Sequence, residues 1–343
     1  MNILGFSYEE FVEEIVKLGL ERYRADQVLD WVYQKLVFSF DQMTNLSKEH
    51  RRLLPQHFSI DLPKVVEKKV SKFDKTTKYL FELKDGNTIE SVLLFHEGYA
   101  TACISTQVGC PIRCSFCATG QSGFVRNLEV DEIVSQILAI EADSRQKIRN
   151  VVYMGMGEPL LNYDNVVKSV RILNHKKMKN IGIRRITIST VGIPEKIIKL
   201  GQEGLDINLA ISLHASSNEK RMQIIPLASK YAIEEILDAA KQFQQNTDRR
   251  VTIEYILIKE FNDYDEDARR LAKILKEMKM KVFVNLIPVN PALPGLERPS
   301  IWKINRFKEI LVESGIEAEV RREKGVDIEA ACGQLRLRAL QKR

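Results

Sequence analysis

The 343-residue sequence has few prolines (10) and tryptophans (2) and no long apolar run. Its 44% hydrophobic and 29% charged residues are ordinary for a globular chain, which excludes a mainly disordered or fibrous protein. No apolar stretch approaches the roughly 18 to 20 residues that cross a bilayer, so we expect no membrane partner. Residues 1–20 carry four glutamates and one lysine and lack the apolar core of a secretory signal, which predicts a cytoplasmic protein.

Positive charge is in small excess overall but is concentrated in three places. The chain has 52 Lys and Arg against 46 Asp and Glu, a net charge of +6. The basic clusters are residues 64–78, 175–185 and 319–343. Each fits either a phosphate-binding surface or an ordinary solvated face. The length predicts two domains, or one large α/β domain with additions.

The five cysteines have the most informative spacing in the sequence. An odd number in a chain without an export signal argues against a disulfide framework. Cys110, Cys114 and Cys117 lie close together between glycines, so their thiolates can turn toward one centre. The spacing leaves open a four-iron cluster with one free iron, a zinc ion that recruits Cys103, or unligated thiols. Alternating side-chain directions in the strand-like run 100–107 disfavour the zinc site.

Two segments with different periodicity precede the cysteine loop. Residues 1–60 have helical spacing, with Ser7 and Glu10 forming a capping box and further helices around 25–36 and 48–54. Residues 65–95 change to a period of two and predict strands with a turn at Asp85-Gly86. Glu90 shares a strand face with apolar residues, a weak sign of acid–base chemistry that a solvated edge residue would also give.

Beyond residue 100, strand-like and helix-like segments alternate to the C-terminal region. The predicted strands are 100–107, 150–154, 185–189, 207–213, 251–258 and 282–288, each followed by a helical segment. Such βα repetition predicts a parallel sheet curled into a partial barrel. In barrels of this kind, ligands bind at the C-terminal ends of the strands.

Five motifs along the chain resemble one family. Cys110-x3-Cys114-x-Phe116-Cys117 is similar to the signature of the radical S-adenosylmethionine (SAM) superfamily, in which the open iron binds SAM. Four further stretches occur in the order seen in the RlmN family of dual-specificity ribosomal and transfer RNA adenine-C2 methyltransferases. They are Met154–Pro159, Thr187–Thr190, Ser212–Ala215 and Asn285–Pro291. The similarity extends over essentially the whole chain.

This resemblance implies an α/β fold, a partial (β/α)6 barrel of the radical SAM type with a small N-terminal helical accessory domain and a β-hairpin extension. We expect the accessory domain, for RNA docking, at residues 1–60 and the strand and hairpin linker at 61–98. The barrel core is expected at 99–316. A C-terminal strand and a mobile segment carrying Cys332 are expected at 317–343.

The resemblance also implies methylation of C2 of an adenosine in 23S rRNA, at the peptidyl-transferase centre, and of the adenosine 3′ to the anticodon in tRNA. One SAM methylates Cys332, and a second SAM yields a radical that takes a hydrogen from this methyl group. The carbon radical adds to C2, Glu90 accepts the C2 proton, and Cys103 attacks to release the RNA, leaving a Cys103–Cys332 disulfide. Three thiolates hold the [4Fe-4S] cluster that cleaves SAM: Cys110, Cys114 and Cys117. Zinc would leave Cys332 unexplained.

The same resemblance implies a SAM site around the rim of the barrel. Its expected residues are Gly157, Glu158, Ser189, Ser212, Leu213, His214 and Asn290. Taken singly, several have ordinary alternatives, since glycines turn the chain, Ser189 can cap a helix and His214 can be a hydrogen-bonded core residue. Their placement around one rim favours ligand binding.

The implied partners are 23S rRNA, tRNA, and flavodoxin or ferredoxin as electron donor, with the protein a monomer. One rival function is the related C8-methylating adenine rRNA methyltransferase, although Pro159 is more typical of the C2 type. A rival from another class is a zinc-stabilised RNA-binding protein without catalysis, which would bind zinc and no iron.

Overall fold

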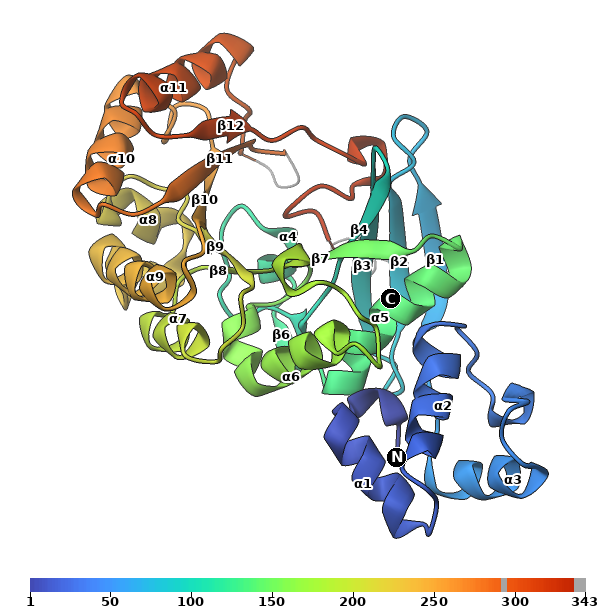
Figure 1. Ribbon diagram of the computed structural model, residues 1–343. Helices are drawn as coiled ribbons and strands as arrows, with labels where there is room; N and C mark the ends of the chain where they lie inside the picture. Colours follow the sequence, from blue (N-terminus) through green and yellow to red (C-terminus); the bar gives the residue numbers. More distant parts are fainter. Residues whose placement is uncertain (291–294, 336–343) are drawn as a thin grey trace.

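The computed structural model describes residues 1–290 and 295–335 and begins with a small helical bundle. Its helices are α1 (Tyr8–Lys17), α2 (Tyr23–Tyr33) and α3 (Lys48–His57). The expected capping box is present, because the Glu10 N–H donates to Ser7 Oγ at 3.2 Å and the Ser7 N–H donates to Glu10 Oε2 at 2.7 Å. The bundle lies below the rest of the molecule in Figure 1.

An antiparallel extension follows, formed by β1 (Lys64–Val70), β2 (Thr77–Glu82) and β3 (Thr88–His96). β3 is also antiparallel to β4 (Tyr99–Cys103). One face of the extension packs on α5 (Val130–Ser144), where Tyr79 Oη donates to Asp143 Oδ2 at 2.8 Å. Because residues two apart share a face, the register places one set of side chains on the opposite face: Lys78, Glu90, Val92 and Cys103.

From β4 onward the sheet is parallel. The further strands are β7 (Ile148–Tyr153), β8 (Ile186–Thr190), β9 (Asn208–Ser212), β10 (Val251–Leu257), β11 (Val282–Pro288) and β12 (Ala318–Val320). All belong to a ten-stranded sheet in the order β1-β2-β3-β4-β7-β8-β9-β10-β11-β12. The antiparallel extension therefore continues one edge of the curved parallel sheet, as Figure 1 shows.

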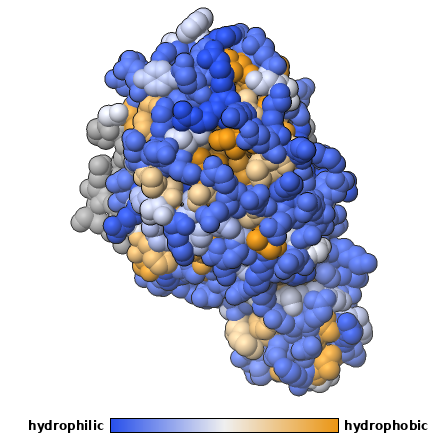
Figure 2. Space-filling model, turned by 90° about the vertical axis from the view of Figure 1, so that its left-hand side faces the viewer, coloured by the Kyte–Doolittle hydropathy of each residue, from blue (hydrophilic) through white to orange (hydrophobic). Residues whose placement is uncertain are grey.

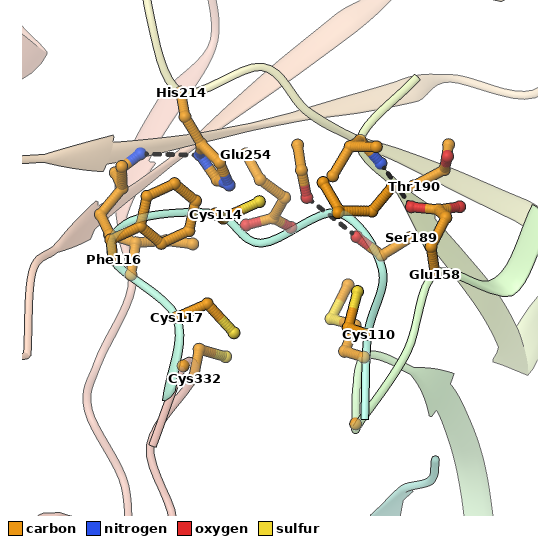
Figure 3. Close-up of a pocket in the computed structure, with 18 of the residues that line it drawn as sticks. Cys110, Cys114, Phe116, Cys117, Glu158, Ser189, Thr190, His214, Glu254 and Cys332 are labelled. Carbon is orange, nitrogen blue, oxygen red and sulfur yellow. Dashed lines mark hydrogen bonds between the residues drawn. The ribbon is translucent and has the colours of Figure 1, made fainter. Parts of the chain in front are cut away.

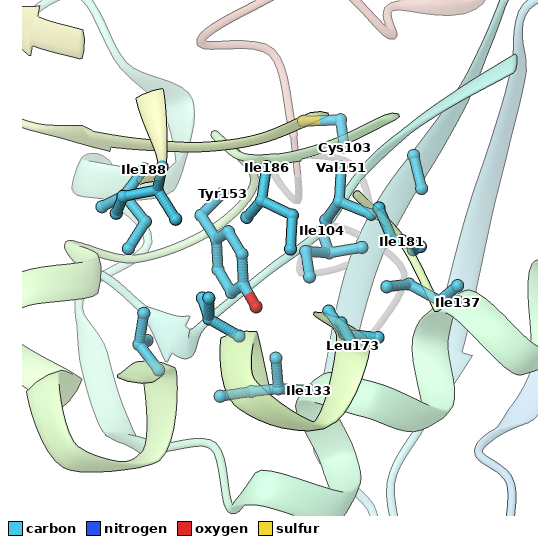
Figure 4. Packing of buried hydrophobic residues seen from close by; sticks show 14 of the residues in the cluster. Cys103, Ile104, Ile133, Ile137, Val151, Tyr153, Leu173, Ile181, Ile186 and Ile188 are labelled. Atoms are coloured by element: carbon cyan, nitrogen blue, oxygen red, sulfur yellow. The ribbon is translucent and has the colours of Figure 1, made fainter. Parts of the chain in front are cut away.

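Helices cover the outer face of the parallel strands (Figure 1). They are α5, α6 (Tyr163–Asn174), α7 (Pro194–Gly201), α8 (Asn218–Ile224), α9 (Ile233–Thr247), α10 (Asp265–Glu277) and α11 (Ile301–Glu313). Figure 4 shows Ile133, Ile137 and Leu173 of these helices packed against Val151 and Ile186 of the strands. This apolar core continues into the N-terminal bundle. The domain boundaries expected at 60, 98 and 316 remain a prediction.

The α/β partial barrel agrees with the sequence analysis, with two differences in its elements. The predicted strand 100–107 ends at Cys103, and Gln107–Gly109 instead forms β5, antiparallel to β6 (Phe124–Asn127). The chain leaves the sheet because Ser105 turns inward, where its Oγ donates to the Glu90 carbonyl oxygen at 2.6 Å. The second difference is the short helix α8, which the sequence analysis did not predict, whereas β12 lies in the region 317–343 where a C-terminal strand was expected.

The surface is mainly polar on the face shown in Figure 2, where hydrophilic side chains predominate and apolar ones gather in small groups. Among the described residues, no helix has both the length and the apolar character needed to cross a membrane.

Candidate active site

The three clustered cysteines lie on a loop that leaves β5 and ends in the short helix α4 (Ala118–Gln121). Gly109 has φ +80°, and a Cβ there would lie 1.9 Å from the Gly123 carbonyl oxygen. This close approach lets the Cys110 N–H donate to Gly123 O at 2.8 Å, which fixes the start of the loop. The side chains of Cys110, Cys114 and Cys117 line one cavity, here called the cysteine cavity (Figure 3).

These thiols fit a cluster better than a single metal ion. Among the described residues, no three or more His, Cys, Asp or Glu side chains meet where one ion could bind. The sulfurs instead line the wall of a shared cavity, which suits a cluster with a separate iron for each thiolate and does not suit a tetrahedral zinc ion. Burial raises the pKa of Cys110 to about 12 and also raises the pKa of Cys114 and Cys117. A bound cluster would stabilise the thiolate forms of these cysteines.

The turn after β7 forms one wall of the cysteine cavity. Gly157 has φ +108°, and an added Cβ would lie 2.7 Å from Thr106 Oγ1, so only glycine fits. The Glu158 N–H donates to Gln107 Oε1 at 2.9 Å. Glu158 Oε2 accepts from the Val191 N–H at 2.9 Å, which ties this turn to the loop after β8. Burial raises the pKa of Glu158 to about 6.

The wall continues beside this turn along the ends of β8, β9 and β11. Ser189 and Ser212 place their Oγ atoms 3.4 Å apart, and Asn290 also lines the cavity. His214 has φ +63°, and its Nδ1 accepts from the Ile256 N–H at 3.1 Å (Figure 3). Burial lowers the pKa of His214 to about 3, so the imidazole is neutral and its Nε2–H remains a donor.

Leu213 is the one predicted SAM-site residue whose side chain lies elsewhere. It is fully buried in the apolar core and does not line the cysteine cavity. Its carbonyl oxygen accepts from the buried Arg221 Nε at 3.1 Å, and its neighbours Ser212 and His214 line the cavity. Two residues lie outside the part of the chain that the structure describes: Pro291 of the Asn285–Pro291 motif and Arg336 of the basic cluster 319–343.

A second cavity, the thiol chamber, adjoins the cysteine cavity and brings together the two remaining cysteines. Cys103 at the end of β4 and Cys332 both line it, and Cys332 and Arg321 line both cavities. In Figure 3 Cys332 lies beside Cys117. The Gly333 carbonyl oxygen accepts from the Ala118 N–H at 2.7 Å, which holds the Cys332 segment on the cysteine loop.

The two chamber thiols have different environments. Cys103 is buried, and burial raises its pKa to about 12 (Figure 4). Cys332 is exposed, and its electrostatic interaction with the neighbouring Arg321 raises the pKa of that guanidinium. Glu90 is buried and forms an ion pair with Lys78, with an N–O distance of 3.4 Å. Its side chain is not among those that line either cavity.

Sequence reasoning missed two charged residues in this region. Glu254, in the middle of β10, is buried, lines the cysteine cavity and accepts from Asn285 Nδ2 at 2.7 Å. An acidic residue within the apolar run Val251–Leu257 is the same kind of signal that singled out Glu90. Arg321 belongs to the basic cluster 319–343, and nothing in the sequence distinguishes it as the residue beside Cys332.

Comparisons with known proteins define the class. The model of the "Radical SAM superfamily" matches residues 104–287, and that of the "Ribosomal RNA large subunit methyltransferase N-terminal domain" matches residues 1–60. The crystal structure of a radical SAM methyltransferase from Sphaerobacter thermophilus has a TM-score of 0.93 and 42% identity, covering 98% of this chain and 99% of that chain. The fold and the cysteine loop are those of a radical SAM enzyme, a class that uses a [4Fe-4S] cluster and SAM.

Two curated relatives narrow the class to a family. "Probable dual-specificity RNA methyltransferase RlmN" of Pseudothermotoga lettingae is 72% identical, over 99% of this chain and 98% of its own length. The protein of the same description from Thermotoga maritima is 66% identical, over 100% of this chain and 99% of its own length. The chain therefore belongs to the RlmN family of radical SAM RNA methyltransferases. The predicted family, fold class and cofactors are confirmed, whereas the roles of individual site residues stay predictions.

Proposed function

We propose that this enzyme methylates C2 of an adenosine in 23S rRNA and C2 of the adenosine 3′ to the anticodon in tRNA. The observation that carries the proposal is the thiol chamber, where Cys103 and Cys332 face a common space next to the cysteine cavity. A metal-binding protein without catalysis needs no such pair of free thiols. In this proposal each turnover uses two SAM molecules, one that donates the methyl group and one that yields the radical.

When bound, the cluster and SAM supply the methyl group and the radical chemistry that an electron-poor ring carbon requires. The protein then supplies acceptors and a base. Cys332 accepts the methyl group on its sulfur, and its carbon becomes bonded to C2 of the adenine. Glu90 accepts the proton that C2 loses. The Cys103 thiolate attacks the Cys332 sulfur, so that an S–S bond forms, the C–S bond to the RNA-bound carbon breaks, and that carbon takes up a proton. The unpaired electron of the adduct would pass to the bound cluster, and two electrons from the proposed flavodoxin or ferredoxin would reduce the Cys103–Cys332 disulfide.

The SAM site in this proposal follows the walls of the cysteine cavity. Cys110, Cys114 and Cys117 hold the cluster, and Gly157 and Glu158 bind the SAM amino group. The remaining contacts are those of Ser189, Ser212, His214 and Asn290, with the Leu213 backbone. Glu158 uses one oxygen for the Val191 N–H and the other for the Leu160 N–H, at 2.9 and 3.0 Å. The Thr190 side chain also hydrogen-bonds this carboxylate, and of its roughly four acceptor positions one remains for an ammonium group.

RNA contacts in this proposal come from exposed residues of the basic clusters, and the target base leaves its stack to enter the chamber. Two lysines of these clusters are buried in ion pairs and do not contact phosphate: Lys78 and Lys179. We also propose a monomer in the cytoplasm that receives electrons from flavodoxin or ferredoxin. Cytoplasmic location follows from substrates that are ribosomal and transfer RNA.

Mass-spectrometric mapping of the modified adenosine in tRNA and 23S rRNA transcripts tests the function. Methyl at C2 is the expected product, and methyl at C8 would assign the enzyme to the rival reaction. Cys332→Ala is expected to prevent methyl loading of the protein, and Cys103→Ala to accumulate a covalent protein–RNA adduct. Normal turnover by Cys103→Ala would refute the resolving role, and unchanged turnover by Glu90→Gln would return Glu90 to a structural role.

A further inference from the structure

Helix α8 carries a fully buried arginine. The Arg221 side chain is only 1% exposed and is the largest fully buried side chain among the described residues. Its Nε donates to the Leu213 carbonyl oxygen at 3.1 Å, and its Nη2 donates to the Val191 carbonyl oxygen. These carbonyls follow β9 and β8, so one guanidinium joins α8 to two loops that contribute residues to the cysteine cavity.

Helix α8 also contacts the cysteine loop directly. The Ser115 N–H donates to the Ile224 carbonyl oxygen at 2.9 Å. Residues three apart share a helix face, so Arg221 lies on the side of α8 that carries Ile224. Buried apolar residues surround this contact and exclude water from it: Ile112, Cys114, Ile224, Ile225, Ala228, Ile256, Ile258 and Val289.

The positive charge of Arg221 acts on residues of the cysteine cavity. Burial raises the pKa of Cys114, and the charge of Arg221 opposes that rise. Burial lowers the pKa of His214, and the charge of Arg221 lowers it further. Cys114 and His214 line the cavity, whereas Arg221 does not. The guanidinium therefore influences the cavity through its charge and not through direct contact with a ligand.

No carboxylate pairs with Arg221 within residues 1–290 and 295–335. A buried charge is costly unless an opposite charge compensates it. Lys179 shows the more common arrangement, because this buried lysine forms an ion pair with Glu141. For Arg221, an anion bound in the cysteine cavity would supply the compensation. An oxidised [4Fe-4S] core with three thiolates has one net negative charge, and one-electron reduction adds a second.

We propose that Arg221 is a positioning residue that holds a permanent positive charge beside the cluster and thereby favours its one-electron reduction. The inference rests on the part of the proposed function that assigns Cys114 to the cluster. Local charge and solvent exposure are among the factors that set the potential of an iron–sulfur cluster. Burial lowers the pKa of Arg221 only to about 10, so the guanidinium is charged at neutral pH. One electron enters the cluster from the proposed flavodoxin or ferredoxin, and no covalent bond forms or breaks in this step.

Two further charged residues lie near the cluster cysteines. Glu158 is buried, and its charge adds to the effect of burial in raising the pKa of Cys110 and Cys114, so it disfavours reduction. Arg113 precedes Cys114 in the sequence, but its side chain is exposed and water screens its charge. Burial therefore distinguishes Arg221 from the arginine adjacent to a cluster cysteine.

The test compares variants with and without the charge. Arg221→Met and Arg221→Gln remove the charge, and Arg221→Gln keeps an amide donor for one carbonyl. Arg221→Lys keeps the charge and loses the fork of donors. Arg113→Met is the matched control, because it removes an exposed charge close to Cys114 in the sequence. The readout is the midpoint potential of the cluster in the reconstituted full-length enzyme, without SAM or RNA. It is measured by anaerobic redox titration with electron paramagnetic resonance detection, and iron and sulfide analysis normalises each sample.

We expect the two neutral variants to have a reduction equilibrium at least about tenfold less favourable than the unmodified enzyme. This is the scale for a unit charge within about 10 Å at an effective dielectric constant of about 20. Tenfold corresponds to a potential about 59 mV lower for a one-electron couple. Arg221→Lys and Arg113→Met should each stay within about threefold of the unmodified enzyme. A merely structural role would change the cluster content or the stability of all three Arg221 variants without separating their potentials by charge.

The outcomes separate this inference from the proposed function. If Cys114→Ala keeps its full iron content, the proposed ligand assignment fails, and the potentials of the Arg221 variants still decide whether this charge acts on the cluster. If a neutral variant binds a cluster and stays within about threefold, or if Arg113→Met falls as far as the neutral variants, the inference is overturned and the proposed function is unaffected. If neither neutral variant binds a cluster, Arg221→Lys decides: an unchanged potential supports the inference, and a tenfold less favourable reduction overturns it.

Discussion

Cys103 is expected to react unusually slowly with alkylating reagents while the protein is folded. Burial raises its pKa to about 12, so at pH 8 only about one Cys103 in 10⁴ is a thiolate. An ordinary thiol with a pKa of about 8.5 is about one quarter thiolate at the same pH. The thiolate fraction of Cys103 is therefore roughly two-thousandfold lower than that of an ordinary thiol. A more basic thiolate is also more nucleophilic, by about 40-fold for this difference in pKa. The alkylation rate of Cys103 should therefore be about 50-fold lower than that of an ordinary thiol, before any loss of reagent access is counted.

The assay is a pulse of iodoacetamide under anaerobic conditions, followed by quenching and mass spectrometry of the Cys103 peptide. The matched reference is the same peptide in urea-unfolded protein, where Cys103 has its ordinary pKa. Alkylation of native Cys103 should rise about tenfold for each pH unit between 8 and 10, while the reference flattens above pH 9. A native rate within about fivefold of the unfolded rate at pH 8 would refute the reasoning. The low thiolate fraction would protect Cys103 from oxidation to a disulfide with Cys332 before RNA binds.

Three further predictions concern the walls of the site and its support. Gly157→Ala would place a Cβ 2.7 Å from Thr106 Oγ1 at φ +108°, so we expect SAM binding at least about tenfold weaker in equilibrium dialysis. Gly204→Ala, with φ +68° and open space, is its control, and equal affinities would contradict the prediction. Lys179→Met would leave Glu141 buried without its cation, and urea unfolding should show a loss of about 3–5 kcal/mol; a loss below about 1 kcal/mol would refute the pairing. Cys114→Ala should lower the iron and sulfide content per chain after anaerobic reconstitution, and full iron content would remove Cys114 from the ligands.

The sequence predicted those features that depend on local pattern. Helical and strand periodicity located the barrel elements to within a few residues, and the cysteine spacing located the loop that lines the cysteine cavity. Contacts between distant segments were not predictable in this way. The burial of Lys78 and its bond to Glu329 depend on how the C-terminal segment folds back, and no local pattern encodes that return. Leu213 shows that a motif can also mislead, because this motif residue has its side chain in the apolar core and not in the cavity.

The path of the chain also has a consequence for synthesis on the ribosome. The cysteine loop is translated and can fold well before Cys332 leaves the exit tunnel, and the Cys332 segment must then return to the oldest strands of the sheet. If Cys332 accepts the methyl group as proposed, a nascent or truncated chain can present the cysteine loop before it contains the methyl acceptor. Such a chain could bind a cluster but could not methylate RNA, so methylation would begin only after translation of the chain has ended.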